Sequence, residues 1–316
     1  MSISKATPGI HKRSVFRTLY QQRQWLWMSV PMLLYILLFN YGPLWGWITA
    51  FMNYKPAKPL FENQWVGLAN FTWLFGRPEF LMAIRNTFAM SLITLVFNTV
   101  TAVGLAVLLN EVRVSGFKRT VQTVTYLPHF LSWVIVVGLA QNMFATDGAV
   151  NQALMRSGIL KGPLFFLGEG RYFWWLVGII HVWKECGWNS IIYLASMSSI
   201  DPTLYEAAEI DGAGRLRKIM HITLPGIKST FIVLLIMNIG MLVSGGDGSF
   251  DVPYLMGQNL LMDWAQTIDI FVLKYGISQG QYGRAIAAGI FKSLVSIALL
   301  LSANLIAKKL DEPTLL

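Results

Sequence analysis

Long apolar runs separated by short polar segments dominate the chain. A helix that crosses a bilayer needs roughly 20 mostly apolar residues. Six runs satisfy this requirement: about 25–48, 87–109, 121–144, 172–197, 227–243 and 285–307. The fourth run has polar residues in its middle and the fifth is short. The pattern predicts an all-α integral membrane protein with six transmembrane helices, which together form one transmembrane domain over residues 25–310.

The composition agrees with this pattern and excludes several other classes of protein. Of the 316 residues, 54% are hydrophobic and only 13% are charged, and the mean hydropathy is +0.51. Soluble domains carry about 25% charged residues, so a soluble enzyme or a disordered chain is a poor interpretation. The single cysteine, Cys186, excludes an intramolecular disulfide framework and a multi-cysteine metal site.

The net charge of +9 indicates orientation in the membrane rather than binding to nucleic acid. Outside the six runs, 13 basic residues lie on one side, in the two terminal segments and two short loops, and 9 lie in the longer opposite loops. The positive-inside rule then places both termini in the cytoplasm. We therefore expect a multi-pass protein of the cytoplasmic (inner) membrane that contacts lipid and no nucleic acid.

The N-terminal segment, residues 1–24, is basic and is followed by an apolar run too long for a signal peptide. Val15, Phe16 and Leu19 alternate with arginines at helical spacing, which predicts a short helix on the cytoplasmic surface; a basic disordered tail is the alternative. Pro31 and Pro43 predict a kink or break of the first helix near residues 40–43. At the other end, residues 311–316 are expected to form a cytoplasmic tail.

The loops on the outer side are long and contain few catalytic signals. The third, residues 244–282, opens with a glycine-rich run and contains a candidate interfacial helix around Phe271. No phosphate-binding GxxxxGK[ST], HExxH or CxxC pattern occurs in the chain, and its four histidines are isolated from one another. The sequence predicts a transport subunit that is not an enzyme and carries no cofactor or metal.

The segment between the fourth and fifth runs, residues 202–225, is the most informative part of the sequence. Asp201 followed by Pro202 is a strong helix start, and Glu206 lies where the helix dipole favours negative charge. Gly212 is suited to end the helix. We expect a short cytoplasmic helix over about 202–211, with small side chains that allow another protein to approach closely.

The spacing Glu-Ala-Ala-x-x-x-Gly, then nine residues, then Ile-x-Leu-Pro resembles the EAA loop of permease subunits of bacterial ABC importers. The likeness continues into residues 183–195 and 282–289, so it covers nearly the whole chain. It is greatest to the carbohydrate-uptake branch, in particular the permeases for oligo- and polysaccharides of the lipoprotein and alginate types. Two departures are Ile219, where many relatives have an aromatic residue, and the glycine run at 245–248.

The resemblance implies a coupling helix that inserts into a cleft of an ATPase subunit. The coupling positions it implies are Glu206, Ala207, Ala208, Asp211, Gly212, Ile222, Leu224 and Pro225. It also implies the partners: a second homologous permease, two ATP-binding cassette subunits that hold ATP and Mg²⁺, and an extracytoplasmic solute-binding protein.

Polar residues inside the predicted spans are candidates for a substrate path, because ionisable groups at membrane depth are costly. These candidates are Lys184, Glu185, Trp188, Asn189, Asn142 and Asn238. Amide and charged groups suit sugar hydroxyls, indole rings suit pyranose faces, and Lys184 suits the charge of an anionic uronide. Pairing of Lys184 and Glu185 as structural contacts between helices is an equal alternative.

The sequence thus predicts a permease subunit of an ATP-driven importer that moves oligosaccharide or polysaccharide, including acidic ones, by alternating access. Two alternatives remain open at this point. One is an ABC permease for another solute, such as a phosphorylated polyol. The other is a secondary transporter or channel without an ATPase partner.

Overall fold

The computed structural model describes residues 22–257 and 261–315, so the surface helix predicted around Phe16 lies outside the described residues. The chain divides into two compact units, Met1–Thr49 and Ala50–Leu316. The first unit contains α2, Arg23–Ile36, then the π-helical turn η1, Leu37–Tyr41, and all but the last two residues of the 3₁₀ helix η2, Gly42–Phe51. Regular α-helix ends at Ile36, close to the predicted kink or break near residues 40–43, but Arg23–Phe51 remains one continuous helical segment. Pro43 lacks the amide hydrogen that an uninterrupted α-helix needs there.

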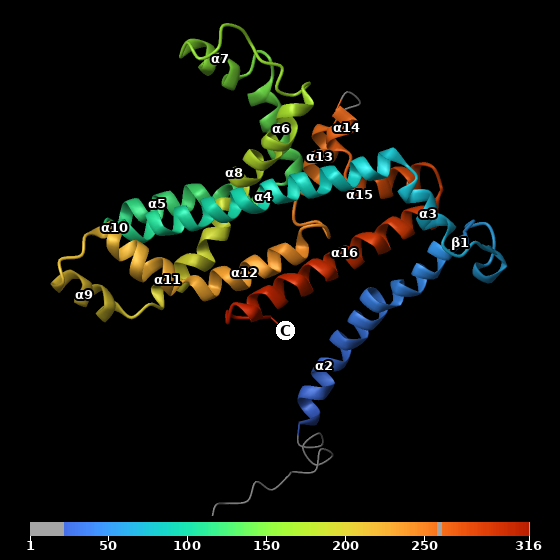
Figure 1. The fold of residues 1–316 in the computed structure, drawn as a ribbon, viewed down its shortest axis with the longest axis horizontal. Helices are drawn as coiled ribbons and strands as arrows, with labels where there is room; N and C mark the ends of the chain where they lie inside the picture. The colour runs from blue at the N-terminus through green and yellow to red at the C-terminus, as the bar shows by residue number, and fades with distance from the viewer. Residues whose placement is uncertain (1–21, 258–260, 316) are drawn as a thin grey trace, which may run out of the picture. The chain divides into compact units, whose positions relative to one another are not determined.

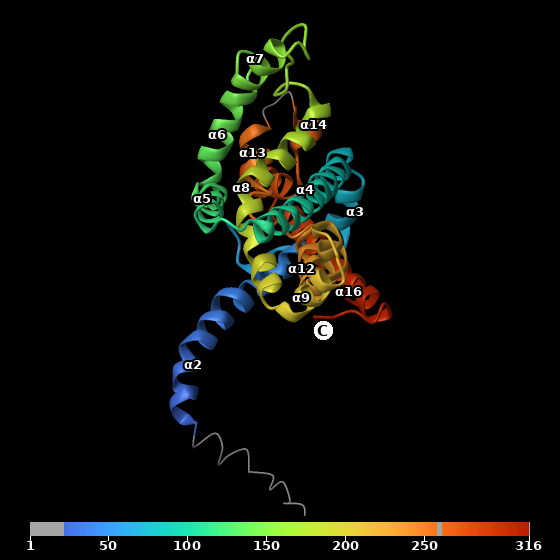
Figure 2. The same ribbon diagram turned by 90° about the vertical axis from the view of Figure 1, so that its left-hand side faces the viewer.

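The second unit is built on four long helices: α4, Pro78–Glu111; α8, Gly170–Ser198; α12, Lys228–Met241; and α16, Tyr282–Lys309. Helices α4 and α8 pack against each other, and α12 lies beside α16 (Figures 1 and 2). A two-residue antiparallel pairing joins β1, Met52–Asn53, to β2, Gln64–Trp65.

Shorter elements connect these helices. Before α8 they are η3, Leu60–Glu62; α3, Ala69–Phe75; α5, Ser115–Tyr126; η4, Leu127–Phe130; α6, Trp133–Phe144; and α7, Ala149–Arg156. Between α8 and α12 they are α9, Pro202–Ile210; α10, Arg215–Lys218; η5, Ile219–Thr223; and α11, Leu224–Gly226. Before α16 they are α13, Asp251–Met256; α14, Met262–Ala265; α15, Ile268–Val272; and η7, Leu273–Ser278.

The third apolar run, residues 121–144, is not the single helix that hydropathy predicts. Helix α5 ends at Tyr126, a 3₁₀ turn follows, and α6 starts anew at Trp133. Pro128 lies in the turn and cannot donate a helical hydrogen bond, while the Ser132 side chain caps α6 by accepting from the Ile135 amide. The helix is therefore interrupted within the apolar run.

Among the described residues, four helical segments are long and apolar enough to cross a membrane: Arg23–Phe51, Pro78–Glu111, Trp133–Arg156 and Tyr282–Lys309. The pair Arg215–Gly226 and Lys228–Met241, bent by 57°, makes a fifth if it counts as one span. Helix α8 has 29 residues, which is long enough, but it is not apolar enough to be counted as a candidate span. Its polar middle, noted in the sequence, is the reason. The structure thus shows an all-α membrane protein with four or five candidate spans.

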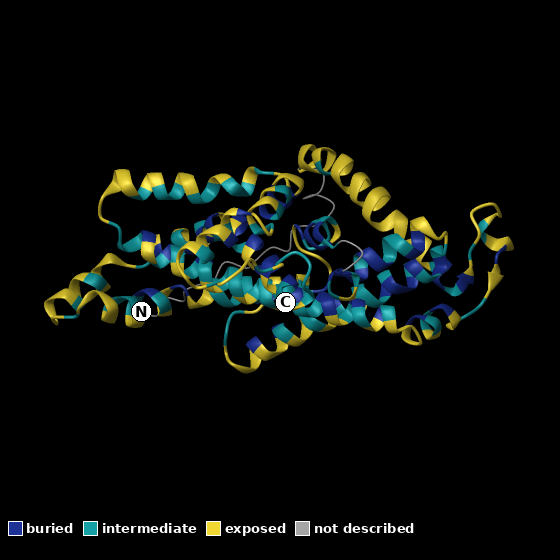
Figure 3. Ribbon diagram, turned by 90° about the horizontal axis from the view of Figure 1, so that it is seen from above, coloured by how far each residue is buried: buried dark blue, intermediate teal, exposed yellow. Residues whose placement is uncertain are grey.

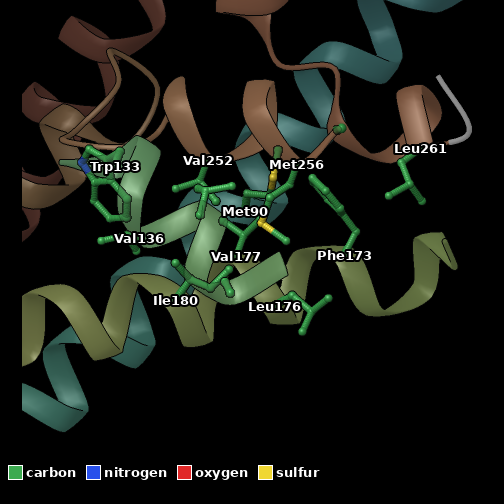
Figure 4. Packing of buried hydrophobic residues seen from close by; sticks show 13 residues of the cluster. Met90, Trp133, Val136, Phe173, Leu176, Val177, Ile180, Val252, Met256 and Leu261 are labelled. Atoms are coloured by element: carbon green, nitrogen blue, oxygen red, sulfur yellow. The ribbon is translucent and has the colours of Figure 1, made fainter. Parts of the chain in front are cut away.

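Three clusters of buried apolar side chains hold the second unit together. One of them joins α4, α6 and α8 to α13 through residues such as Met90, Val136, Val177 and Val252 (Figure 4). Buried and exposed positions alternate along the long helices (Figure 3). The cluster fixes the segment that follows α12 against α6 and α8, and that segment borders the cavities described below.

Candidate coupling helix and transport cavity

Helix α9 follows α8 and precedes α10 along the chain (Figure 1). It is capped at both ends. At its start, Oδ1 of Asp201 accepts a hydrogen bond of 2.9 Å from the Thr203 amide, and Pro202 occupies the first helical position. This hydrogen bond holds the pKa of the Asp201 carboxyl below its usual value. The predicted helix start is confirmed, and its cap satisfies one of the amides that a helix leaves without a partner.

The C-terminus of α9 is a Schellman motif centred on a left-handed glycine. Gly212 has φ of +73°, its amide donates to the Glu209 carbonyl at 3.1 Å, and the Ala213 amide donates to the Ala208 carbonyl at 2.8 Å. Nothing lies within 4 Å of the position that a Cβ would take on Gly212. The backbone conformation, and not crowding, is therefore the reason for glycine here.

Two side-chain contacts fasten α9 to the following helical segment. The Tyr205 hydroxyl and the Thr223 hydroxyl are 3.0 Å apart, and Nζ of Lys218 donates to Oε1 of Glu209 at 3.0 Å. The hydrogen bond from Lys218 lowers the pKa of Glu209. Because one contact lies on each half of the short helix, α9 is held in a fixed orientation.

The opposite side of α9 is an exposed surface that is both apolar and charged. Glu206, Ala207, Asp211 and Gly212 are exposed, and Ala208 is half-buried. Large apolar side chains are also exposed: Leu204 and Ile210 on α9, with Ile210 at 88%, and Leu216 and Met220 in the segments that follow. Exposed apolar groups rimmed by charges are typical of a protein interaction site.

The remaining predicted coupling residues lie at the junction with α12. Ile222 and Leu224 are half-buried, and Leu224 packs against the cluster that contains Ile227. Pro225 is exposed, one residue before the break at which the chain turns by 57° into α12. A displacement of α9 would therefore reach α12 through this packed corner.

A cavity of about 380 Å³ lies between α4, α8, α12 and the segment after α12. Its lining runs along α4 from Thr87 to Ala102, about 22 Å at 1.5 Å per residue. Three predicted path residues, Glu185, Asn189 and Asn238, line it. Hydroxyl and amide groups of α4 complete the polar lining: Thr87, Ser91, Thr94, Asn98 and Thr99.

A second cavity, of about 770 Å³, is bordered by residues 244–251, by α15 and η7, and by the first half of α16. Lys292 of α16 contributes to its wall and forms an ion pair with Asp269 of α15. Five residues line both cavities: Gly245, Gly246, Asp247, Ser249 and Asp269. The glycine-rich run after α12 therefore forms the boundary between the two spaces.

Lys184 and Glu185 are buried and hold the break between α5 and α6. Nζ of Lys184 donates to Oε1 of Glu185 at 2.7 Å and to the His129 carbonyl at 2.8 Å. Oε2 of Glu185 lies 2.8 Å from Nδ1 of the same histidine. Backbone outside regular helix needs hydrogen-bond partners at membrane depth; Lys184 supplies one to the His129 carbonyl, and Glu185 contacts the ring of the same histidine.

The structure matches a family of transport proteins and several of its members. The family model "Binding-protein-dependent transport system inner membrane component" matches residues 98–312. The chain belongs to this family. It is also 41% identical over 291 residues to Protein LplB of Bacillus subtilis, covering 92% of this chain and 90% of that protein.

Two further comparisons agree. The polygalacturonan/rhamnogalacturonan transport system permease protein YteP of Bacillus subtilis is 41% identical over 295 residues, covering 93% of this chain and 90% of that protein. A crystal structure of a bacterial ABC transporter involved in the import of the acidic polysaccharide alginate superposes with a TM-score of 0.84 at 34% identity, covering 93% of this chain and 98% of that chain.

Family membership confirms that this chain is a permease subunit of an ABC importer, a multi-pass protein of the inner membrane without enzymatic activity of its own. ATP is used by partner ATPases in this family. The alternative of a secondary transporter without an ATPase partner is thereby excluded.

Not every predicted path residue of the permease borders a cavity. The Trp188 ring stacks on His129 with centroids 4.3 Å apart, and neither it nor Lys184 lines either cavity. Asn142 is exposed on α6 and lies outside both linings. The linings of the two cavities therefore do not support the substrate-path assignment of these three residues, which stays a prediction.

Sequence reasoning missed three residues that the structure brings to the site: His129, Asp247 and Asp269. His129 follows Pro128, and a proline inside an apolar run was the available signal for a break with an unpaired carbonyl. Asp247 lies within the glycine run that looked unusual, where an acidic residue between glycines indicates a loop that carries a charge. Asp269 gave no such signal, because its partner Lys292 is 23 residues away.

Proposed function

We propose that this permease moves oligosaccharide or polysaccharide, including acidic ones, into the cytoplasm by alternating access. The observation that carries the proposal is α9, a doubly capped helix whose exposed face bears Glu206 and Ala207 beside apolar side chains. ATP-driven closure of two ATPases is transmitted by a rigid element, and α9 has the fixation and the exposed face that such an element requires.

The proposed topology has six transmembrane helices with both termini in the cytoplasm. Helix α8 is the fourth of them, with its polar residues facing a cavity or the α5–α6 break instead of lipid. The proposed assembly contains a second homologous permease, two ATP-binding cassette subunits that bind ATP and Mg²⁺, and an extracytoplasmic solute-binding protein. The eight coupling residues, from Glu206 to Pro225, are proposed to act at the contact with one ATPase subunit.

The cargo class follows from the relatives and from the cavity lining. YteP is named for polygalacturonan and rhamnogalacturonan, and the superposed structure for the acidic polysaccharide alginate. All three polymers are acidic or partly acidic. Hydroxyl and amide groups along the cavity of about 380 Å³ suit a chain of sugar hydroxyls. The proposed substrate path comprises Glu185, Asn189 and Asn238, with Lys184, Trp188 and Asn142 as residues predicted from the sequence.

The test is a reconstitution of the complete transporter from co-expressed subunits, with the binding protein loaded with saccharide. We expect the loaded binding protein to stimulate ATP hydrolysis, and Glu206→Lys or Gly212→Asp to abolish the stimulation while membrane insertion is retained. Glu62→Lys, a charge reversal on an exposed short helix of the opposite side, is the matched control and should be stimulated as the wild type is.

Stimulation that persists in both α9 variants would contradict the coupling assignment. Stimulation by a phosphorylated polyol and by no saccharide would contradict the cargo class while leaving the coupling assignment intact. The two parts of the proposal can therefore fail separately.

A further inference from the structure

The loop 244–249 separates two cavities, and its backbone fits there only because of two glycines. Gly245 has φ of +88° and Gly248 has φ of +74°, values that side chains rarely adopt. A Cβ on Gly248 would lie 2.3 Å from the Trp133 ring, and one on Gly245 would lie 2.8 Å from the Ser249 hydroxyl. The loop is therefore closely seated at both ends.

Charged side chains contact the loop near both of its ends. A Cβ on Gly245 would come within 3.4 Å of the Asp269 carboxylate and 3.5 Å of Nζ of Lys292, so this end of the loop rests on the Asp269–Lys292 ion pair. At the other end, Oδ2 of Asp247 lies 3.5 Å from Nζ of Lys184.

The contact between Lys184 and Asp247 is one in which another anion can replace the aspartate. An ammonium group has three donors, and two of those of Lys184 are held at 2.7 and 2.8 Å by Glu185 and by the His129 carbonyl. The third direction is left to Asp247, whose distance of 3.5 Å is longer than a hydrogen bond. The lysine side chain is 3% exposed, whereas that of the aspartate is 62% exposed. Lys184 is thus fixed, and its partner on the loop is loosely held.

We infer that the loop 244–249 is a gate between the two cavities, and that Asp247 takes the place on Lys184 that a cargo carboxylate takes during transport. This inference rests on the proposed function and narrows its cargo to saccharides that carry carboxylates. Replacement of one carboxylate by another leaves the charge around Lys184 unchanged. A neutral sugar has no carboxylate to offer Lys184. When such a sugar passes, Asp247 leaves Lys184 without a replacement, and the free energy of the ion pair is lost.

The first experiment measures gating without cargo. Gly246 is a suitable reporter because a Cβ there meets nothing within 4 Å and its φ is not positive. In the assembled transporter with Cys186→Ala and Gly246→Cys, we expect Asp247→Asn to raise the rate at which a charged thiol reagent labels the introduced thiol by about three- to fivefold. An exposed ion pair shifts an equilibrium by up to about fivefold.

Two further variants separate the gate from a simple loss of charge. Asp251→Asn removes a carboxylate from the wall of the same cavity of about 770 Å³ but no ion pair among the described residues, so its labelling rate should equal that of the parent. Gly248→Ala pushes the loop away from Trp133 without changing any charge and should raise labelling as Asp247→Asn does. If Asp247→Asn fails to assemble, Gly248→Ala decides the question of the gate alone.

The second experiment measures selectivity in proteoliposomes, with an oligogalacturonide and a neutral galactose oligosaccharide of equal length as probes. We expect the wild type to prefer the acidic probe and Asp247→Asn to lower the acidic-to-neutral transport ratio about fivefold. An unchanged labelling rate in both loop variants would overturn the gate, and an unchanged ratio would overturn the role of Asp247. If neither probe is transported by the wild type, the proposed cargo fails, while the labelling result still decides whether the loop moves.

Discussion

Removal of the Lys184 charge should destabilise the protein more than any single change at its surface. Lys184→Met leaves the Glu185 carboxylate, whose side chain is 10% exposed, without its cation at 2.7 Å. It also removes the donor to the His129 carbonyl. Removal of one partner of a buried ion pair costs about 3–5 kcal/mol. We include in this range the hydrogen bond that the His129 carbonyl loses. We expect Lys184→Met to be destabilised by that amount.

The double variant Lys184→Met/Glu185→Gln is the informative comparison. Because it also removes the buried negative charge, the remaining loss is that of hydrogen bonds, about 1–2 kcal/mol. The double variant should therefore be more stable than Lys184→Met alone, although it carries one more substitution. Non-additivity of this sign is what a buried pair in direct contact produces.

Thermal unfolding of the purified protein in detergent measures these differences. At about 2 °C for each kcal/mol, Lys184→Met should lower the midpoint by roughly 6 °C or more. The matched control is Lys274→Met, since Lys274 is 39% exposed and pairs with Glu79 at 3.4 Å; an exposed pair contributes at most about 1 kcal/mol. A midpoint of Lys184→Met equal to that of the control, or a double variant less stable than the single, would refute the reasoning.

Three further predictions concern contacts between α8 and α5 and the capping of α9. Gly187→Ala should lower the unfolding midpoint by the equivalent of about 1–3 kcal/mol, because a Cβ there would lie 2.1 Å from the Thr125 carbonyl oxygen of α5; Gly104→Ala, with open space, should not. Asp201→Ala should weaken α9 by about 1 kcal/mol, measured as faster amide exchange over Pro202–Ile210, whereas Asp201→Ser should not. Glu209 has its pKa lowered from 4.5 by Lys218, so their contact is complete above pH 4.5 and is lost as the pH falls below it. A carboxyl titration by carbon-13 NMR should show this midpoint below 4.5, and Lys218→Met should raise it.

The ends of α9 could be predicted because helix caps are local. Asp201, Pro202 and Gly212 act on backbone groups within a few residues of themselves, so the sequence alone contains both partners of each interaction. The anchoring contacts of the same helix could not be predicted in this way. Tyr205 reaches Thr223 across 18 residues, and that pairing depends on how α10 and η5 turn back toward α9.

The third apolar run shows the limit of hydropathy. A window of about 20 residues averages over Pro128, so the break between α5 and α6 leaves the average almost unchanged. Lys184, 55 residues beyond His129, donates to the His129 carbonyl in this break, and Glu185, 56 residues beyond, contacts the ring of the same histidine. The sequence singled out both residues as polar groups within an apolar run, but the partner of Lys184 is a backbone carbonyl that the third apolar run concealed.

Cavity residues were predicted only as far as helix faces can be assigned. Glu185 and Asn189 are four residues apart on one face of α8, and both line the cavity of about 380 Å³. Trp188 lies on the neighbouring face, where it stacks on His129. For Asn142 the sequence supplied no polar residue three or four positions earlier with which to define a face, so its orientation depended on the direction of α6 after the break, which hydropathy did not predict.

The break after α5 and the glycine loop after α12 are linked by the same lysine. Lys184 donates to the His129 carbonyl of the break and lies 3.5 Å from Asp247 of the loop, and its Nζ lies 4.7 Å from the centre of the Trp133 ring, on which Gly248 rests. Irregular backbone is tolerated at membrane depth only where protein or a cavity satisfies it. Because both segments contact Lys184, their movements are coupled. When Asp247 leaves Lys184, the electrostatic environment of the ammonium group that bonds the His129 carbonyl changes. Opening of the gate should therefore shift the α5–α6 junction, and with it the close contact of α5 with Gly187 on α8, the helix that leads directly to α9.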